Sequence, residues 1–587
     1  MSLQENNNMR NHFYRASAAD FGKIPGNPVA YWATDSQIRM FETCPRLSDV
    51  ASIAEGTTTG DVNRFLKMWH EISSLTIGFD FKNSQLAESS GFKWFPYNKG
   101  GEYRKWYGNN DFLVNWEGNG QALKSYGGSF VRGEKYYFLP GVTWSKVSSS
   151  ALSFRFFNEG FLFDTGGLCL FSKEINYCLS ILNSKASLAI MKLLAPTLNF
   201  TVGTVSSIPI HQSVVGVERL SLKLIEQSKS DWDSYEVSWD FSNFPLLHLS
   251  DSQPLINASY QNLRTRWHET TLEMQHLEEE NNRLFIEAYG LQDELTPDVP
   301  LSEITLTCNP HYRYGSNLTD EEREARLQSD TIAELISYAI GCMMGRYSLD
   351  REGLVYAHTG NEGFKALVEE GAYATFAADE DGILPLSTDS WFEDDVATRL
   401  EAFVCTVWGA ETLEENLQFI ADSLCLAAIK PVKKGGETAR ETIRRYLSTQ
   451  FFKDHLKTYK KRPIYWLFSS GKEKAFECLV YLHRYNEATL PRMRTEYVTP
   501  LLGQMAGRID RLRLQQAEAG TAEAKRIGKD IDSLTKQLTE LRAFDDELKH
   551  HADMRITLDL DDGVKVNYGK FGTLLSEVKA ITGDKGE

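Results

Sequence analysis

Signatures of a membrane protein or a zinc protein are absent from this sequence of 587 residues. No apolar run approaches the roughly 20 residues that a membrane-spanning helix needs. The eight cysteines include no C-x-x-C pair and no histidines at zinc-ligand spacing. This usage is typical of reduced, buried thiols and predicts a cytoplasmic protein without a metal site and without a membrane partner.

Motifs of common cofactor and catalytic sites are missing as well. There is no G-x-G-x-x-G and no G-x-x-x-x-G-K-[ST] loop to hold a dinucleotide or a nucleoside triphosphate. H-E-x-x-H, G-x-S-x-G and EF-hand patterns are also absent. Consecutive acids such as Glu278, Glu279 and Glu280 do not share one helix face, so they make poor metal cages. We expect no catalytic residue, no cofactor site and no metal site in this chain.

One segment comes close to a catalytic motif. C-N-P-H-Y, Cys308–Tyr312, resembles the Asn-Pro-Pro-Tyr loop with which adenine-N6 methyltransferases hold the target amino group, but His311 replaces the second proline. No glycine-rich S-adenosylmethionine loop precedes it. A structural loop is the favoured interpretation, and a complete enzyme that uses Cys308 and His311 is the weakest alternative.

The net charge of −17 is unevenly distributed. Residues 1–210 carry 20 Lys and Arg against 17 Asp and Glu, which leaves 43 against 63 for the remainder. Within that remainder, residues 430–494 hold 16 cations against 6 carboxylates. Two non-acidic regions separated by an acidic one suit two surfaces that close on a polyanion. Ordinary charge variation along a large acidic protein is the alternative.

Cations and aromatics alternate in the stretch K-W-F-P-Y-N-K-G-G-E-Y-R-K-W-Y-G-N-N-D, Lys93–Asp111. Cations bind phosphate, aromatics stack on bases or support a groove, and asparagine reads base edges. This pattern favours a nucleic-acid contact. The alternative is a structured loop whose aromatics belong to the core, and we expect Trp94, Trp106 and Trp144 to pack in this way.

Strands and helices are both expected in the first half. Residues 20–210 alternate short aromatic and β-branched runs with glycine-containing turns, which predicts strands. Residues 175–194 have helical spacing with a turn at Asn183–Ser184, and residues 199–210 predict a strand, a turn and a proline exit. Apolar residues recur every 3.5 positions over residues 253–288, which predicts one long helix with a packing seam.

The second half is expected to be largely helical, which makes the fold class α+β. Amphipathic helices are predicted near Thr331–Arg346 and Thr398–Trp408. Basic helices are interrupted by a strand or turn at Lys461–Gly471. Residues 497–550 predict a helical hairpin, and Arg555–Gly572 predicts a β-hairpin with its turn at Asp562–Gly563.

Several segments together resemble one family of proteins. They are E-G-T-T-T-G-D-V-N-R-F-L (Glu55–Leu66), the Lys93–Asn110 stretch, G-V-T-W-S-K-V-S-S-S (Gly141–Ser150), Leu198–Ile210, Asp231–Phe241, Ala339–Asp350, Lys460–Lys472 and Leu558–Gly572. The chain is similar in these segments to PglX, the adenine-specific DNA methyltransferase family of BREX phage-defence systems. The resemblance runs through nearly the whole chain in family order.

The resemblance implies a DNA-reading half of such an enzyme. The family's catalytic half, with its S-adenosylmethionine loop, would lie before residue 1, so no catalytic residue is carried over. The expected partners are double-stranded DNA and other defence-system subunits or a separate methyltransferase half. The expected segments are a polar N-terminal segment (1–19), a DNA target-recognition domain (20–215), a linker with a long connector helix (216–299), an acidic helical domain (300–429), a basic helical region (430–496) and a helical hairpin with a C-terminal β-hairpin (497–587).

The expected DNA contacts lie in loops of the first domain and in the basic region. Arg and Lys are common phosphate and guanine contacts, Ser and Thr anchor the backbone, and Asn reads bases. The candidates are Thr58, Thr59, Arg64, Lys93, Asn98, Lys99, Arg104, Lys105, Ser148, Ser149, Arg155, Lys460, Lys461 and Arg462. A scaffold that holds other subunits, without DNA reading of its own, is the alternative function.

Overall fold

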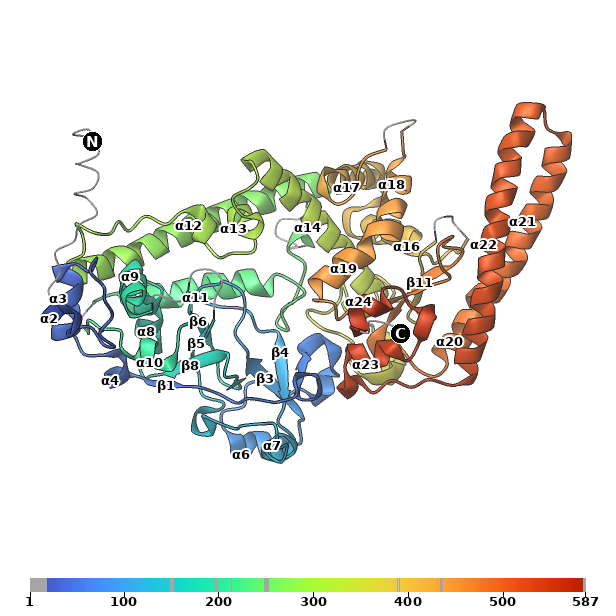
Figure 1. Ribbon diagram of the computed structural model, residues 1–587. Coiled ribbons are helices and arrows are strands. Elements are labelled where there is room, and N and C mark those ends of the chain that lie inside the picture. The colour runs from blue at the N-terminus through green and yellow to red at the C-terminus, as the bar shows by residue number, and fades with distance from the viewer. Residues whose placement is uncertain are drawn as a thin grey trace, which may run out of the picture. The chain divides into compact units, whose positions relative to one another are not determined.

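The structure is a computed structural model, in which residues 18–147, 152–195, 199–212, 214–247, 253–387, 389, 391–432 and 436–583 are described. Its fold is α+β, as expected, with small sheets and several long helices (Figure 1). In the part of the chain that the structure describes, no helix is long and apolar enough to cross a membrane.

Two compact units divide the chain, and each is assembled from three separated segments. Unit 1 comprises Met1–Lys67, Thr76–Trp232 and Arg266–Asn317. Unit 2 comprises Met68–Leu75, Asp233–Thr265 and Leu318–Glu587. The six segments expected from the sequence stay a prediction, since this division does not test boundaries within either unit.

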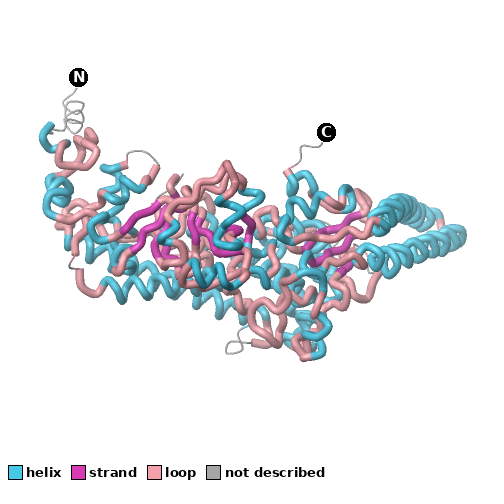
Figure 2. The backbone as a smooth tube through the Cα atoms, turned by 90° about the horizontal axis from the view of Figure 1, so that it is seen from below, coloured by secondary structure: helices cyan, strands magenta, loops and turns pink. Residues whose placement is uncertain are grey.

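The strands of unit 1 form two small four-stranded sheets, visible among the magenta segments of Figure 2. One is antiparallel, with the order β1 (Ser52–Ala54), β8 (Gly167–Phe171), β5 (Gly141–Ser145) and β6 (Arg155–Phe157). The other has the order β2 (Leu66–Met68), β4 (Phe112–Asn115), β3 (Trp94–Asn98) and β7 (Leu162–Phe163). All five residues of β3 are buried, which explains why its sequence shows no polar alternation.

The helical spacing expected over residues 175–194 is confirmed, with two helices, one on either side of the expected turn. α8 (Ile175–Leu182) and α9 (Lys185–Leu194) flank the expected turn, and the Ser184 hydroxyl caps α9 by accepting from the Ser187 amide. The others are α2 (Ala18–Phe21), α3 (Asp35–Thr43), α4 (Leu47–Val50), α5 (Val62–Phe65), α6 (Ser84–Ser90), α7 (Glu117–Lys124), α10 (Val202–Ser206) and α11 (Val217–Asp233).

The expected long helix is present as α12, Ile256–Ala288. Residues up to Thr265 belong to unit 2 and residues from Arg266 belong to unit 1. Its seam is buried at Ile256, Tyr260, Leu263, Met274 and Leu277. The 3.5-residue spacing therefore marks a packing seam, as expected.

Unit 2 is built around a three-stranded antiparallel sheet with the order β10 (Tyr465–Ser469), β11 (Glu477–Tyr481) and β9 (Ile383–Pro385). The expected helical hairpin is formed by α21 (Thr499–Glu518) and α22 (Thr521–Asp553), which run side by side (Figure 1). In unit 1, α13 (Pro310–Tyr314) follows the long helix. The other α-helices of unit 2 are α14 (Asp320–Met343), α15 (Phe364–Glu369), α16 (Val396–Trp408), α17 (Leu413–Ala427), α18 (Ala439–Tyr446), α19 (Phe452–Thr458), α20 (Thr489–Arg492), α23 (Val564–Gly569) and α24 (Val578–Thr582).

Two segments expected to contain strands are helical. Thr201 caps α10 by accepting from the Thr204 amide, and a threonine at this position favours a helix start. The expected C-terminal β-hairpin is wrong: α23 follows the supposed turn. Its buried positions are Val564, Asn567 and Tyr568, which is helical spacing, whereas Val566 is 55% exposed.

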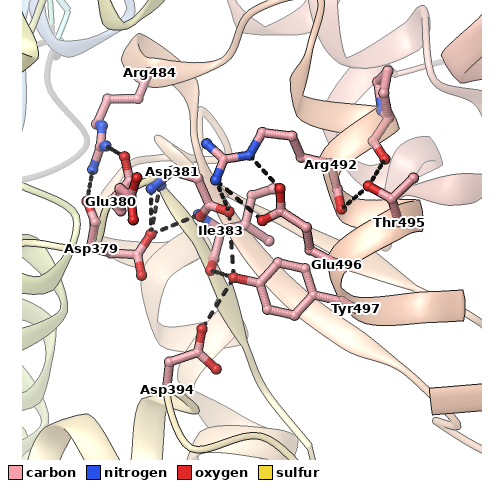
Figure 3. Close-up of polar contacts among 12 residues, drawn as sticks. Asp379, Glu380, Asp381, Ile383, Asp394, Arg484, Arg492, Thr495, Glu496 and Tyr497 are labelled. Carbon is pink, nitrogen blue, oxygen red and sulfur yellow. Dashed lines mark hydrogen bonds and ion pairs between the residues drawn. The ribbon is translucent and has the colours of Figure 1, made fainter. Parts of the chain in front are cut away.

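A turn rich in carboxylates leads into β9 (Figure 3). One oxygen of Asp379 accepts hydrogen bonds from the backbone amides of Asp381 and Gly382. The Tyr497 hydroxyl lies 3.1 Å from Asp394 and 3.4 Å from Asp381. Burial and the neighbouring Asp379 carboxylate raise the pKa of Asp381 to about 8. Burial and the like charge of Asp379 outweigh the Arg492 guanidinium, which lies 3.5 Å from Asp381 and lowers its pKa, so Asp381 holds a proton near neutral pH.

This proton makes the stability of unit 2 depend on pH. Unfolded Asp titrates near pH 3.9, so the folded state binds the extra proton between about pH 4 and pH 8. The extra proton's contribution to the free energy of unfolding is fully present below that window and is lost as the pH rises through about 8. The free energy of unfolding falls by at most about 1.4 kcal/mol per pH unit within the window. Asp381→Asn should flatten this slope and raise stability above pH 8, as urea unfolding at pH 5 and pH 8.5 will show. Asp510→Asn, on the exposed face of α21, controls for the loss of one carboxylate. An unchanged slope in D381N would contradict the shared proton.

Candidate nucleic-acid interface

The stretch from Lys93 to Asp111 begins as strand β3 rather than as a loop. Lys93 is half-buried, with its ammonium 5.9 Å from the Trp94 ring centroid. Lys99 follows the strand with its ammonium 4.8 Å from the Phe112 ring centroid. Burial lowers the pKa of Lys99 and Asp164 offsets part of that shift. Asn98, the last residue of β3, is buried. Lys93 and Lys99 therefore reach the surface, whereas Asn98 does not.

The three tryptophans expected to pack do so. Trp94, Trp106 and Trp144 are all fully buried. The Trp144 indole donates to the backbone oxygen of Phe200 at 3.0 Å, and the Trp106 indole donates to Glu278 at 2.8 Å. Their rings therefore support the sheets and are not presented to solvent.

Arg104 lies inside unit 1, where it is held by an ion pair. Its guanidinium donates to Asp231 at 2.7 Å and to the Thr307 hydroxyl at 2.9 Å. Its Nε donates to the backbone oxygen of Tyr107 at 2.8 Å. The side chains of Arg104 and Asp231 are 4% and 2% exposed. The guanidinium expected to contact phosphate or guanine is thus occupied by internal acceptors.

Lys105 is buried in the same way. Its ammonium pairs with Glu278, a residue of α12, and both side chains are about 5% exposed or less. Burial alone would lower the pKa of Lys105, but the Glu278 carboxylate, with Tyr103 and Glu303, raises it overall. Burial raises the pKa of the Glu278 carboxyl, and hydrogen bonds from Lys105 and Trp106 oppose that shift. The pair joins the segment between β3 and β4 to α12.

For Arg155, on β6, the described residues provide no carboxylate at hydrogen-bond distance. Arg155 is 1% exposed, and its Nη1 lies 3.4 Å from the backbone oxygen of Arg104. Burial lowers the pKa of Arg155 to about 10. Arg104, Lys105 and Arg155 are therefore three buried cations of unit 1, and their side chains do not face solvent in this structure.

Two neighbouring loops of unit 1 carry Phe130 and three of the candidate contacts, Thr58, Thr59 and Arg64. Thr58 and Phe130 exchange two backbone hydrogen bonds, of 2.9 and 2.8 Å, and form an isolated β-bridge. Gly60 packs against Gly128 so closely that a Cβ on Gly60 would lie 2.3 Å from the Gly128 oxygen. Thr58 is half-buried and Thr59 is buried. We call residues 57–64 and 126–133 the paired loops.

The paired loops present an aromatic ring and guanidinium groups. Phe130 is 63% exposed, and Arg132 lies with its guanidinium carbon 5.8 Å from that ring centroid. Arg64 is exposed, with its guanidinium carbon 5.6 Å from the ring centroid of Tyr126. Arg132 also pairs with Glu55 at 3.1 Å. Sequence analysis missed Phe130 and Arg132, although the glycine pair just before them indicates a loop.

Ser148 and Ser149 lie outside the described residues. Lys146, two residues before Ser148, pairs with Glu55 at 2.7 Å. Hydrogen bonding by Lys146 lowers the pKa of Glu55 and keeps it ionised.

The basic candidates of unit 2 follow α19. Lys460 and Lys461 are exposed and both adopt left-handed backbone conformations, with φ of 50° and 59°. Such conformations are uncommon for residues other than glycine and need support from their surroundings. The amide of Lys461 donates to the Leu456 oxygen at 2.7 Å and supplies that support. Arg462 is half-buried, with its guanidinium 3.5 Å from Glu71.

The Cys308–Tyr312 segment is structural in its local contacts. The Asn309 amide donates to the backbone oxygens of Leu301 and Ile304, and its oxygen accepts from the His311 amide as the cap of α13. Burial raises the pKa of Cys308 well above its ordinary value, which makes it a poor nucleophile. Among the described residues, no group of His, Cys, Asp and Glu side chains could hold a metal ion.

No family model matches the chain. The curated proteins that it matches are adenine-specific methyltransferases. It is 52% identical over 586 residues, 99% of its length, to the adenine-specific methyltransferase BrxX of Escherichia coli O9:H4 (strain HS). It is 37% identical over 585 residues, 95% of its length, to the adenine-specific methyltransferase PglX of Lacticaseibacillus casei (strain Zhang). The matches cover 47% and 45% of those proteins, so the chain spans about half the length of the curated relatives.

Proposed function

We propose that this chain supplies double-stranded DNA recognition to an adenine-N6 DNA methyltransferase of a BREX-like phage-defence system. Its similarity to adenine-specific methyltransferases over nearly all of its length supports the enzyme class. The observation that carries the DNA-reading role is the pair of loops in unit 1, fixed by backbone hydrogen bonds and bearing exposed Arg64 and Arg132. Rigid loops with guanidinium groups suit phosphate and base contacts.

We do not assign methyl transfer to the residues of this chain. S-adenosylmethionine would be the methyl donor of the whole enzyme, but the residues of this chain do not fit it. The sequence contains no G-x-G-x-x-G motif, and the Asn309 amide is already occupied by backbone acceptors. We therefore derive no chemical step from these residues.

The proposed contacts are those whose polar groups reach the surface. In unit 1 they are Thr58, Arg64, Lys93, Lys99 and Arg132. In unit 2, Lys460 and Lys461 would hold the DNA backbone as phosphate contacts. Asn98, Thr59, Arg104, Lys105 and Arg155 would contribute only indirectly, because their side chains are buried.

Selection from a random pool of double-stranded DNA tests this function. The chain should enrich a defined motif at two salt concentrations. Arg64→Ala and Lys99→Ala should each weaken binding and lower the salt slope by about one released counterion. Lys82→Ala, an exposed lysine of the same unit, should bind as the wild type does. If the chain binds DNA but enriches no motif, and if this binding falls steeply as the salt concentration rises, the chain contacts only the DNA phosphate backbone. No binding at low salt would refute the proposal.

A scaffold function is the second candidate, and the α21–α22 hairpin favours it. Leu514, near its tip, is 70% exposed, and most of the neighbouring side chains are exposed as well. A projecting helical hairpin offers two helix faces to a partner helix. Retention of other defence subunits by the wild-type chain, and their loss on removal of residues 506–530, would support this role independently of DNA binding.

A further inference from the structure

Phe130 is the most exposed of the large aromatic side chains among the described residues. Its exposed fraction is 63%, against 50% for Tyr31 and 42% for Trp32. Tyr31 and Trp32 pack edge-to-face on each other, with centroids 5.0 Å apart. Leaving a phenyl ring in water forgoes about 1.5–3 kcal/mol of burial free energy. The ring of Phe130 is therefore a strong candidate for contact with a partner.

The backbone beneath this ring is rigidly held. Phe130 donates to and accepts from Thr58 across the bridge between the paired loops. The preceding residue, Ser129, donates through its hydroxyl to the Tyr126 oxygen at 3.0 Å. On the other loop, the Thr57 oxygen accepts from the Tyr97 hydroxyl at 2.9 Å, which ties the loop to buried strand β3. A side chain on such a support keeps its direction when a partner binds.

Guanidinium groups lie close to this ring, and Glu55 pairs with one of them, Arg132, at 3.1 Å. Arg132 lies over one side of the ring, and Arg64 lies over Tyr126 of the same loop. Lys135, three residues beyond Arg132, is also exposed. An exposed apolar ring beside guanidinium groups suits contact with a nucleic acid, and it also occurs in protein interfaces, where phenylalanine and arginine are both enriched. It matches the wedge residues of DNA-deforming proteins, which pair an apolar side chain with phosphate contacts.

We propose that Phe130 inserts between base pairs of duplex DNA, while Arg64 and Arg132 bind the flanking phosphates. This inference rests on the proposed function and adds a physical role for one residue. Insertion separates two stacked base pairs, and the phenyl face replaces part of the lost stacking. Local unstacking of this kind lowers the cost of displacing a neighbouring base, which adenine-N6 chemistry requires.

Plasmid unwinding tests the insertion without knowledge of the recognised site. Closed circular plasmid is relaxed by a topoisomerase with and without the 587-residue chain, and the linking number is read after deproteinisation. The wild type should lower the linking number in proportion to bound protein. Phe130→Ala should abolish unwinding and weaken binding about tenfold, which is within the range expected for the loss of one base–aromatic stack. Phe130→Trp should unwind as the wild type does.

Controls separate this inference from the function on which it rests. Leu86→Ala removes a 49% exposed apolar side chain of the same unit and should change neither binding nor unwinding. Melting temperatures should match across all variants, since Phe130 is largely outside the core. Binding by the wild type without unwinding, or unwinding by Phe130→Ala, would overturn the wedge and leave DNA recognition intact. Absence of any wild-type binding would overturn both. Loss of association with a protein subunit, with DNA behaviour unchanged, would assign the ring to a protein partner.

Discussion

Replacing Asp231 by alanine should lower the free energy of unfolding of unit 1 by about 3–5 kcal/mol. Asp231 accepts hydrogen bonds from Arg104 at 2.7 Å and from the backbone amides of Thr307 and Cys308 at 2.7 and 2.9 Å. The substitution strands a buried guanidinium and two amides together. Removing one member of a buried ion pair costs far more than removing both, because the remaining charge has lost its compensation.

Two matched variants test this explanation. Asp231→Asn keeps the shape and one acceptor oxygen but loses the charge, and it should fall between wild type and alanine. The double variant Arg104→Met with Asp231→Leu removes both charges and should recover the part of the loss that comes from the stranded guanidinium, while the Thr307 and Cys308 amides still lack their acceptor. Denaturant midpoints, together with hydrogen exchange of β3 and α11, provide the measurement. A double variant as unstable as Asp231→Ala would show that the charge is not the cause.

Replacing Arg484 by lysine should destabilise unit 2 by about 3–5 kcal/mol despite the conserved charge. Its guanidinium donates to the backbone oxygens of Asp379 and Glu380, both at 2.7 Å, and to the Asn361 side chain at 2.7 Å. Figure 3 shows it above the turn that leads into β9. Lysine cannot reproduce this fork, so buried carbonyls would lose their donors.

The ring contact of Arg484 adds to the same effect. Its guanidinium carbon lies 3.6 Å from the ring centroid of Phe364. Arg513→Lys, at a 61% exposed arginine of α21, is the matched control and should change stability by less than about 0.5 kcal/mol. Urea unfolding followed by far-UV circular dichroism gives both values. Equal stability of R484K and the wild type would mean that the guanidinium contacts contribute little.

Periodicity predicted the helices of this fold better than its strands. The α12 seam and the α21–α22 hairpin have long repeats, so their residues determine the helix over many turns. The segment at α23 is short, and V-K-V-N-Y fits either a strand face or a helix face. Packing decided it: Tyr568 lies 5.1 Å, centroid to centroid, from Trp466. That contact joins residues about a hundred positions apart, which local sequence cannot reveal.

The sequence could not show which of the candidate contacts are buried and which reach the surface. A cation beside an aromatic is compatible with a surface contact or with a buried ion pair. Arg104 and Lys105 are buried because Asp231 and Glu278, more than a hundred residues away, supply their counter-charges. Phe130 was not predicted, because the neighbouring sequence does not show that this phenylalanine remains exposed to solvent. Whether the expected contacts bind DNA remains a prediction.

The counter-charges from α11 and α12 also constrain how site specificity can be exchanged between relatives. A graft limited to residues 20–215 would carry Arg104 and Lys105 but leave Asp231 and Glu278 with the recipient. If the recipient lacks matching acids, the chimera receives two unpaired charges in its core. If the proposed function holds, a change of the recognised site would require α11 and α12 to be transferred together with the DNA-contacting loops, so the segment to be exchanged is larger than the contact surface itself.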